Sequence, residues 1–388
     1  MKKITILLFL FLSTAVFAKS DIPISGESIG DMASFDSAME RILSDNAIPG
    51  GSLAVSYKGK PLLVKSYGYA SKNLFGDSIP ATPEKRWRLA SISKSITSVA
   101  ILQLVEQGKV QLDDPLLNYF KDSNTPAKLS DERFKKITVR MLLQHRSGLL
   151  TASDDPMTGP SPPCPRKTTR WIESHNLADD PGVKYSYSNM GYCLLGHVIE
   201  SASGIGYEQY VQKMLLAIGA NSVRMGKSKD SGNDEVIYYN SPDEARGPYN
   251  SFSLEELGSA GGLTATPSDL VKFADHIFGN KKSLLERKET FLEIITPPAG
   301  ITDRRFYGLG FNVVLSGQDS ATIFHSGSLV GTSTFLAKYS NGWTIAAAFN
   351  RRKKDYANLI LSIDRALSNA RNNATPPDST QELSLKYR

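Results

Sequence analysis

Ser91 and Lys94 stand three residues apart at the start of a long apolar stretch, in the segment Ser91-Ile92-Ser93-Lys94. On a helix, residues with this spacing share a face, with about 5–6 Å between their Cβ atoms. The Lys94 amine would then reach the Ser91 hydroxyl, and serine becomes a useful nucleophile only beside a base or a cation. The N–H groups at a helix N-terminus would also favour developing negative charge. A capping serine followed by a solvated lysine has the same sequence, so the tetrapeptide alone leaves both interpretations open.

Tyr187 and Asn189 form a second group, in Tyr187-Ser188-Asn189 just before a predicted helix. A phenol can transfer protons once a nearby lysine lowers its pKa. An asparagine amide has donors and an acceptor, so it can contact Lys94 and a substrate carbonyl together. The alternative is that Ser188 or Asn189 only caps the helix. This motif by itself does not separate the two roles.

The third group is His325-Ser326-Gly327-Ser328, near the start of a predicted β-hairpin late in the chain. An edge strand offers backbone groups to which an extended substrate can add as a further strand. The backbone N–H of Ser328 could join that of Ser91 as an oxyanion hole, and Gly327 would let the substrate backbone approach closely. The alternative is a polar strand end without a role.

The order Ser-x-x-Lys, Tyr-x-Asn, His-x-Gly resembles the serine β-lactamase and penicillin-binding-protein-like superfamily, in its class C, D,D-carboxypeptidase and esterase branch (peptidase S12-like). Supporting phrases are spread over the chain, at residues 88–94, 142–149, 181–192, 259–263, 307–311 and 325–327. The resemblance implies that Ser91 is the acylated nucleophile and that Lys94 and Tyr187 are the proton-transfer pair. Asn189 would contact the substrate and the lysine. No cofactor and no metal are implied.

One position departs from the β-lactamases of this branch: His325 stands where they carry the lysine of Lys-Thr-Gly. Histidine there looks more like the carboxypeptidases, D-amino-acid peptidases and esterases, because a neutral imidazole attracts a carboxylate less than lysine does. The resemblance therefore implies a serine hydrolase acting on small-molecule or peptide substrates, including those derived from peptidoglycan. A short-chain esterase or a β-lactamase is the alternative, and a penicillin-binding sensor that acylates without turnover is a second.

The elements that must position these residues follow from periodicity and turn signals. Residues 88–107 are predicted to form the helix that begins near Ser91, and His145 is interpreted as a turn residue that organises the helical part. Further helices are predicted at 138–144, 168–174, 191–203, 207–217, 268–278, 284–295 and 356–368, and strands at 51–57, 62–67, 308–315, 321–325, 332–339 and 344–349.

This element order predicts an α/β domain from residues 19–84 and 296–368, with a mainly helical domain, 85–295, inserted between its halves. The α/β domain would contain an antiparallel sheet built from both chain ends and flanked by terminal helices. Such an α/β plus α architecture is the one that the resemblance implies. The remaining polar tail, 369–388, is predicted to be disordered.

Residues 1–18 are predicted to be a secretory signal. Lys2 and Lys3 precede the apolar run 4–12, and Val16-Phe17-Ala18 offers a cleavage site after Ala18. The run is shorter than the roughly 20 residues of a membrane span, although a retained anchor is the alternative. We therefore expect a periplasmic protein without a stable membrane span.

Charge and cysteine content narrow the possible partners. The net charge of +6 comes from 45 basic and 39 acidic residues without a long run of one sign, which argues against a nucleic-acid partner. Cys164 and Cys193 are the two cysteines, too few for a tetrahedral zinc site on their own. Export favours a disulfide between them, whereas the apolar surroundings of Cys193 favour a buried core thiol.

Overall fold

The computed structural model describes residues 22–73, 77–121, 125–149, 164, 168–229, 232–279 and 282–373. The predicted signal, 1–18, most of the loop 151–165 and the end of the tail lie outside the described residues. The beginning of the tail is helical, because the last helix continues to Asn373 instead of ending at 368.

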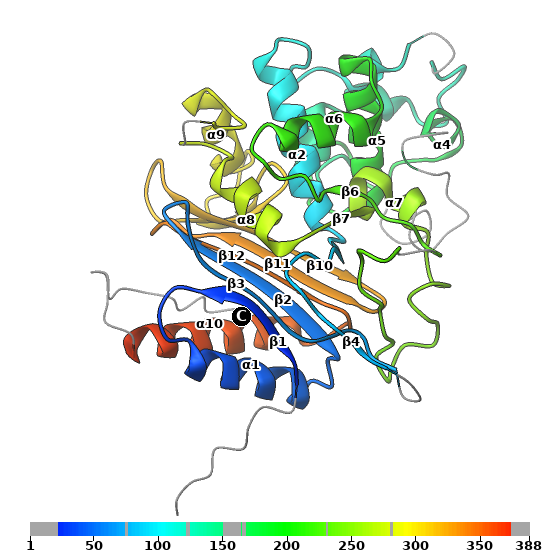
Figure 1. Cartoon of the computed structure of the whole chain (residues 1–388). Helices are drawn as coiled ribbons and strands as arrows, with labels where there is room; N and C mark the ends of the chain where they lie inside the picture. Colours follow the sequence, from blue (N-terminus) through cyan, green and yellow to red (C-terminus); the bar gives the residue numbers. More distant parts are fainter. Residues whose placement is uncertain are drawn as a thin grey trace, which may run out of the picture.

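In the described part of the chain, a nine-stranded sheet forms the centre of the molecule (Figure 1). Strands β2 and β12 pair antiparallel, which joins the two ends of the chain as predicted. Along the sheet the order is β1-β3-β2-β12-β11-β10-β9-β8, and β4 pairs with β3. The strands are β1 Ile24–Ser28, β2 Gly50–Tyr57, β3 Lys60–Ser71, β4 Ile79–Pro80, β8 Arg305–Tyr307, β9 Asn312–Leu315, β10 Ala321–Leu329, β11 Thr332–Lys338 and β12 Trp343–Phe349.

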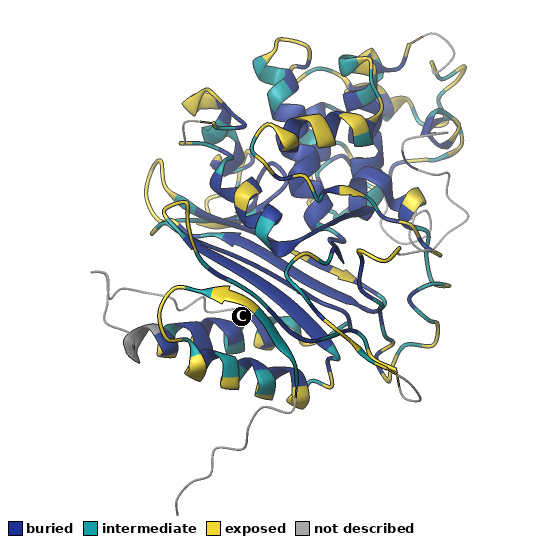
Figure 2. Ribbon diagram, viewed as in Figure 1, coloured by how far each residue is buried: buried dark blue, intermediate teal, exposed yellow. Residues whose placement is uncertain are grey.

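Two terminal helices, α1 (Ala33–Asp45) and α10 (Tyr356–Asn373), cover one face of this sheet (Figure 1). Their apolar stripes meet the sheet in one core cluster, to which Phe35, Leu53 and Ile363 belong. The other face carries the helical lobe. The central strands are therefore buried on both sides (Figure 2), and this explains why their sequences read as continuous apolar runs.

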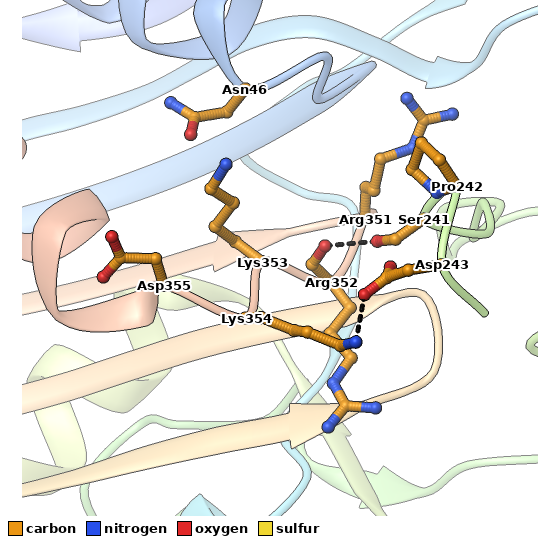
Figure 3. A pocket seen from close by; sticks show the side chains of 9 residues that line it. All are labelled: Asn46, Ser241, Pro242, Asp243, Arg351, Arg352, Lys353, Lys354 and Asp355. Atoms are coloured by element: carbon orange, nitrogen blue, oxygen red, sulfur yellow. Dashed lines mark hydrogen bonds and ion pairs between the residues drawn. The ribbon is translucent and has the colours of Figure 1, made fainter.

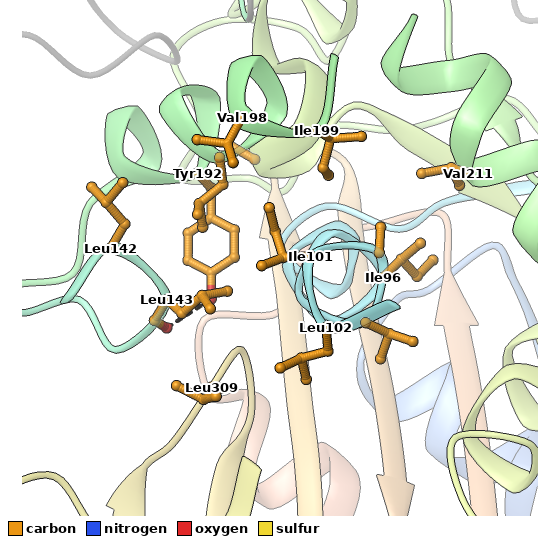
Figure 4. Packing of buried hydrophobic residues seen from close by; sticks show 14 of the residues in the cluster. Ile96, Ile101, Leu102, Leu142, Leu143, Tyr192, Val198, Ile199, Val211 and Leu309 are labelled. Atoms are coloured by element: carbon orange, nitrogen blue, oxygen red, sulfur yellow. Dashed lines mark hydrogen bonds between the residues drawn. The ribbon is translucent and has the colours of Figure 1, made fainter. Parts of the chain in front are cut away.

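Helix α2 (Ile92–Glu106) lies at the centre of the helical lobe, and apolar side chains surround it (Figure 4). The other helices are α3 Val139–Leu143, α4 Thr168–Ser174, α5 Asn189–Ser203, α6 Tyr207–Leu216, α7 Leu254–Gly261, α8 Pro267–Asp275 and α9 Lys288–Ile295, with 3₁₀ turns η1 Leu116–Tyr119 and η3 Glu132–Lys136. A small sheet, β5 Trp87–Arg88, β7 Leu263–Ala265 and β6 Arg224–Met225, completes the lobe.

The start of α2 differs from the predicted helix 88–107. Residues Trp87 and Arg88 pair with β7 as a strand, and Ala90 adopts a left-handed backbone with φ +49°. This conformation ends the strand and begins the helix, so Ser91 becomes its N-cap residue. The helix ends as expected, since Gly108 follows it with φ +69°.

Cys164 and Cys193 are paired as a disulfide, with Cα atoms 4.8 Å apart. Both residues are buried, but Cys193 is bridged and is not a free core thiol. Cys164 packs against Gly258 of α7, where a Cβ would lie only 2.7 Å from the cysteine Cβ. The bridge thus ties Cys164, which packs against α7, to α5 at a position four residues after Asn189.

Removing this bridge is expected to destabilise the protein. The cysteines are 29 residues apart, and the loop-entropy relation gives about 3–4 kcal/mol for a loop of this length. Thermal unfolding of the double variant Cys164→Ala, Cys193→Ala should show a melting temperature lower by several degrees. Adding a reductant should lower the melting temperature of the wild type but leave the double variant unchanged. Equal melting temperatures for wild type and double variant would contradict the prediction.

Candidate active site

Lys94 lies beneath the Ser91 hydroxyl, buried within the lobe. Its Nζ donates to Ser91 Oγ at 3.3 Å, to Asn189 Oδ1 at 2.7 Å and to the Ala260 carbonyl at 2.6 Å. The side chain has no solvent exposure, and these oxygens come from the N-cap of α2, from α5 and from α7. The amine is therefore held in one position. Ser91 is partly exposed, so a substrate can reach its hydroxyl from the solvent side.

Tyr187 reaches the same oxygen from the loop before α5. Its hydroxyl donates to Ser91 Oγ at 2.8 Å, and Lys94 Nζ lies 4.8 Å from the centre of its ring. One oxygen thus contacts both a lysine and a phenol, a geometry suited to moving a proton away from serine. Ser188 accepts the Gly191 N–H as the N-cap of α5. Helix capping and the Lys94 contact of Asn189 therefore exist side by side, instead of being alternatives.

Strand β10 forms the opposite side of the site. Strand β9 pairs with it only over Ala321–Phe324, so among the described strands none covers the remainder of that edge. Ser326 and Ser328 are exposed there, while Gly327 is buried. The edge has the form that the sequence predicted for an extended substrate. The strand continues to Leu329 instead of ending at residue 325, so the motif lies inside it.

Gly327 has a different neighbour from the one the sequence suggested. A Cβ on this residue would lie 2.3 Å from the Leu89 carbonyl oxygen and 3.0 Å from the Ala90 Cβ. Glycine is therefore required here because the backbone just before α2 lies in close contact with β10. Ser91 directly follows Ala90, and Ser328 directly follows Gly327. These are the two residues whose N–H groups were expected to form the oxyanion hole.

His325 is 3% exposed and held at both ring nitrogens. Nδ1 donates to the Ser326 carbonyl at 2.7 Å, which leaves Nε2 to accept from the Tyr307 hydroxyl at 3.0 Å. Burial, assisted by the positive charge of Lys94, lowers the pKa of His325 to about 3. The ring is thus neutral at physiological pH, and its nitrogens are satisfied within the protein.

The family described as Beta-lactamase matches residues 35–367, which is most of the chain. This chain belongs to the Beta-lactamase family. Protein flp of Staphylococcus aureus (strain MRSA252) is 27% identical over 326 residues, 81% of this chain and 62% of that protein. The chain thus spans less than two thirds of the length of this relative.

Solved structures agree with the family assignment. The octameric penicillin-binding protein homologue from Pyrococcus abyssi superimposes with a TM-score of 0.70 at 26% identity, over 87% of this chain and 77% of that one. The D-amino acid amidase from Ochrobactrum anthropi SV3 complexed with D-phenylalanine gives a TM-score of 0.69 at 23% identity, over 87% and 100%. The second likeness shows the fold alone.

Sequence reasoning missed one charged neighbour of the site in this Beta-lactamase-family chain. Arg352 Nε donates to Ser328 Oγ at 3.0 Å, and its guanidinium pairs with Glu244 at 3.7 Å. The run Arg351-Arg352-Lys353-Lys354 directly after β12 was the available signal. It lines a pocket of about 370 Å³ (Figure 3) together with Asn46, Ser241, Pro242, Asp243 and Asp355.

Two further observations concern the described residues only. No three of their His, Cys, Asp or Glu side chains gather into a group that could hold a metal ion. None of their helices is both long and apolar enough to cross a membrane.

Proposed function

We propose that this chain is an exported serine hydrolase that forms an acyl-enzyme on Ser91 and cleaves amide or ester bonds, with D-alanyl-type peptides as the preferred substrates. The observation that carries the proposal is the double contact at Ser91 Oγ, from Lys94 at 3.3 Å and Tyr187 at 2.8 Å. The disulfide supports export, because such bonds persist in oxidising compartments.

The geometry supports the following steps. The reactive form of the pair is one proton short, as a Tyr187 phenolate beside the Lys94 ammonium. Ser91 Oγ attacks the substrate carbonyl carbon while its proton passes to this phenolate oxygen. The carbonyl electrons move to the oxygen, which the N–H groups of Ser91 and Ser328 stabilise. When the tetrahedral intermediate collapses, the bond to the leaving group breaks and the leaving group takes the proton. Water then attacks the acyl-enzyme with the same proton transfers and restores the Ser91 hydroxyl.

Charge beside β10 supports a substrate with a carboxylate. The neutral ring of His325 attracts such a group weakly, whereas Arg352 places a guanidinium on Ser328, at the exposed edge of the strand. A guanidinium suits a carboxylate because it offers several N–H donors, and the Glu244 oxygen paired with Arg352 lies 3.7 Å away, beyond hydrogen-bonding distance. We therefore assign selection of a peptide C-terminus to Arg352 instead of His325. A neutral short-chain ester, which needs no such cation, is the second candidate substrate.

Steady-state rates of the purified chain from residue 19 onward test the proposal. The probes are a D-Ala-D-Ala peptide, the same peptide with its C-terminus amidated, a chromogenic cephalosporin and a short-chain nitrophenyl ester. We expect the largest rate enhancement over the uncatalysed reaction for the D-Ala-D-Ala peptide with a free C-terminus. Failure of every probe to be hydrolysed or to form a covalent adduct would refute the serine-hydrolase proposal, and a burst without turnover would favour the sensor alternative.

Arg352→Gln is expected to lower kcat/KM for the free peptide about tenfold, the effect of losing one charge-assisted hydrogen bond. The amidated peptide and the ester should change less, because they carry no carboxylate. Lys353→Gln is the matched control, since it removes a neighbouring charge whose side chain does not contact Ser328. If both variants reduce all substrates equally, the assignment to Arg352 is wrong.

A further inference from the structure

His145 encloses Tyr187 from three directions. Its carbonyl oxygen accepts the Ser186 N–H at 2.7 Å, and its ring Nδ1 accepts the Ser188 N–H at 3.0 Å. The imidazole also packs against the Tyr187 ring, with centroids 4.2 Å apart and planes inclined by 35°. Both chain neighbours of Tyr187 and its ring are therefore bound by a single residue, which lies just after α3.

The remaining nitrogen of this ring is unusual. Because Nδ1 accepts a hydrogen bond, the proton of the neutral ring is on Nε2. Nε2 is buried and has no hydrogen-bond partner among the residues that the structure describes. His145 is only 1% exposed, and leaving a buried donor unmade costs roughly 1–3 kcal/mol. A side chain present for packing alone would avoid this cost.

The backbone of His145 is strained as well. Its φ of +55° lies in the left-handed region, which residues other than glycine adopt rarely and which asparagine tolerates best. Strain of this kind persists only where the surrounding structure over-determines it, often at functional sites. Here the strained conformation turns the carbonyl and the ring of His145 toward the Tyr187 segment.

Several ionisable side chains from different elements surround the His145 ring. Burial, with the charge of Lys94 as a smaller cause, holds the pKa of His145 well below its ordinary value. The ring therefore stays neutral and does not compete for the proton that Ser91 releases. Its other aromatic neighbours are Tyr185 before α5, Tyr192 on α5 and Tyr307 on β8, at centroid distances of 6.0, 5.0 and 4.7 Å.

We propose that His145 is a positioning residue that holds the Tyr187 hydroxyl at hydrogen-bonding distance from Ser91 Oγ and acts on the reaction only through Tyr187. This inference rests on the acyl-enzyme function proposed above. It adds to the sequence interpretation of His145 as a turn residue, since His145 does lie in the turn after α3. The ring touches Tyr187, and no contact with a reacting atom is required.

His145→Asn tests the proposal, because asparagine tolerates the left-handed backbone and can still accept the Ser188 N–H, but has no ring to pack against Tyr187. We expect the acylation rate constant to fall about 10–100-fold, as for a displaced catalytic group, with KM changed little. In a Tyr187→Phe background the same substitution should cost less than about twofold, since the hydroxyl that His145 positions is already gone. His145→Gln carries the same predictions if the asparagine variant does not fold.

His197→Asn is the matched control. His197 is also a buried histidine, in the middle of α5, and its ring packs against that of Phe120 with centroids 4.1 Å apart. Its replacement should affect stability but not the acylation rate. A near-normal rate for His145→Asn would overturn the proposal. The proposal would also be overturned if the loss of acylation rate in the double variant His145→Asn, Tyr187→Phe equalled the product of the two single losses. Such independence would mean that His145 does not act through Tyr187.

A readout without turnover separates this inference from the proposed function. In the wild type, the Tyr187 hydroxyl lies 2.8 Å from Ser91 Oγ. In a crystal structure of His145→Asn, these two oxygens should be too far apart for a hydrogen bond. An unchanged distance would overturn the positioning role. If the wild type formed no acyl-enzyme with any probe, the proposed function would fail, and this distance would still decide what His145 does.

Discussion

Ser91→Ala is expected to abolish covalent labelling by a fluorescent penicillin or a fluorophosphonate. The substitution removes the Ser91 oxygen that Lys94 and Tyr187 both contact, which is the nucleophile of the proposed mechanism. Turnover of every substrate should fall to the background rate. Intact-mass spectrometry after incubation with the label measures the adduct directly.

The fold should survive this change, because Ser91 is partly exposed and makes no side-chain capping bond for α2. Ser93→Ala is a suitable control. Ser93 lies in the same motif but its hydroxyl accepts the Leu263 N–H in the interior, so its loss should lower stability and leave labelling intact. Labelling that persists in Ser91→Ala would place the nucleophile elsewhere.

Tyr187→Phe should produce the second largest loss, about 10²–10⁴-fold in kcat, the range that general acid–base groups contribute. The variant keeps the ring that packs against His145 and Lys94 and removes only the hydroxyl bound to Ser91. Substrate binding should therefore change little, so KM should stay within a few fold. Stopped-flow measurement of acylation and of deacylation shows which step depends on the hydroxyl.

Tyr185→Phe provides the comparison. This tyrosine precedes Tyr187 by two residues and is 46% exposed, and removing its hydroxyl should leave kcat close to that of the wild type. A near-normal rate for Tyr187→Phe would reduce Tyr187 to a packing residue. Equal losses in both variants would point to a general disturbance of the loop.

Most of the sheet could be predicted from the sequence, because strand signals are local. The hairpin of β2 and β3 and the late strands β10 to β12 follow from short apolar runs between turn residues. Terminal helices were predicted, but no range was assigned to α1, although its buried residues Phe35, Met39 and Ile42 have helical spacing. Helix α7 was also missed, and its non-helical residue Gly258 interrupts the pattern.

For the candidate site, the sequence by itself indicated the residues that we propose carry the chemistry. The spacing of Ser91 and Lys94 is a property of one helix turn, and Tyr187 and Asn189 are adjacent in one loop. Such short-range patterns are readable because the backbone geometry that relates the residues is known in advance. The prediction that Asn189 contacts Lys94 is confirmed at 2.7 Å.

Only the tertiary structure decided how those residues are held and charged. The Ala260 carbonyl that binds Lys94 is 166 residues away in the chain, and Arg352 reaches Ser328 from another strand end. No local pattern specifies contacts of this kind, because they depend on how whole elements pack. The neutrality of His325 and the three contacts of His145 with the Tyr187 segment have the same origin, since burial sets the pKa of an imidazole and burial exists only in the folded chain.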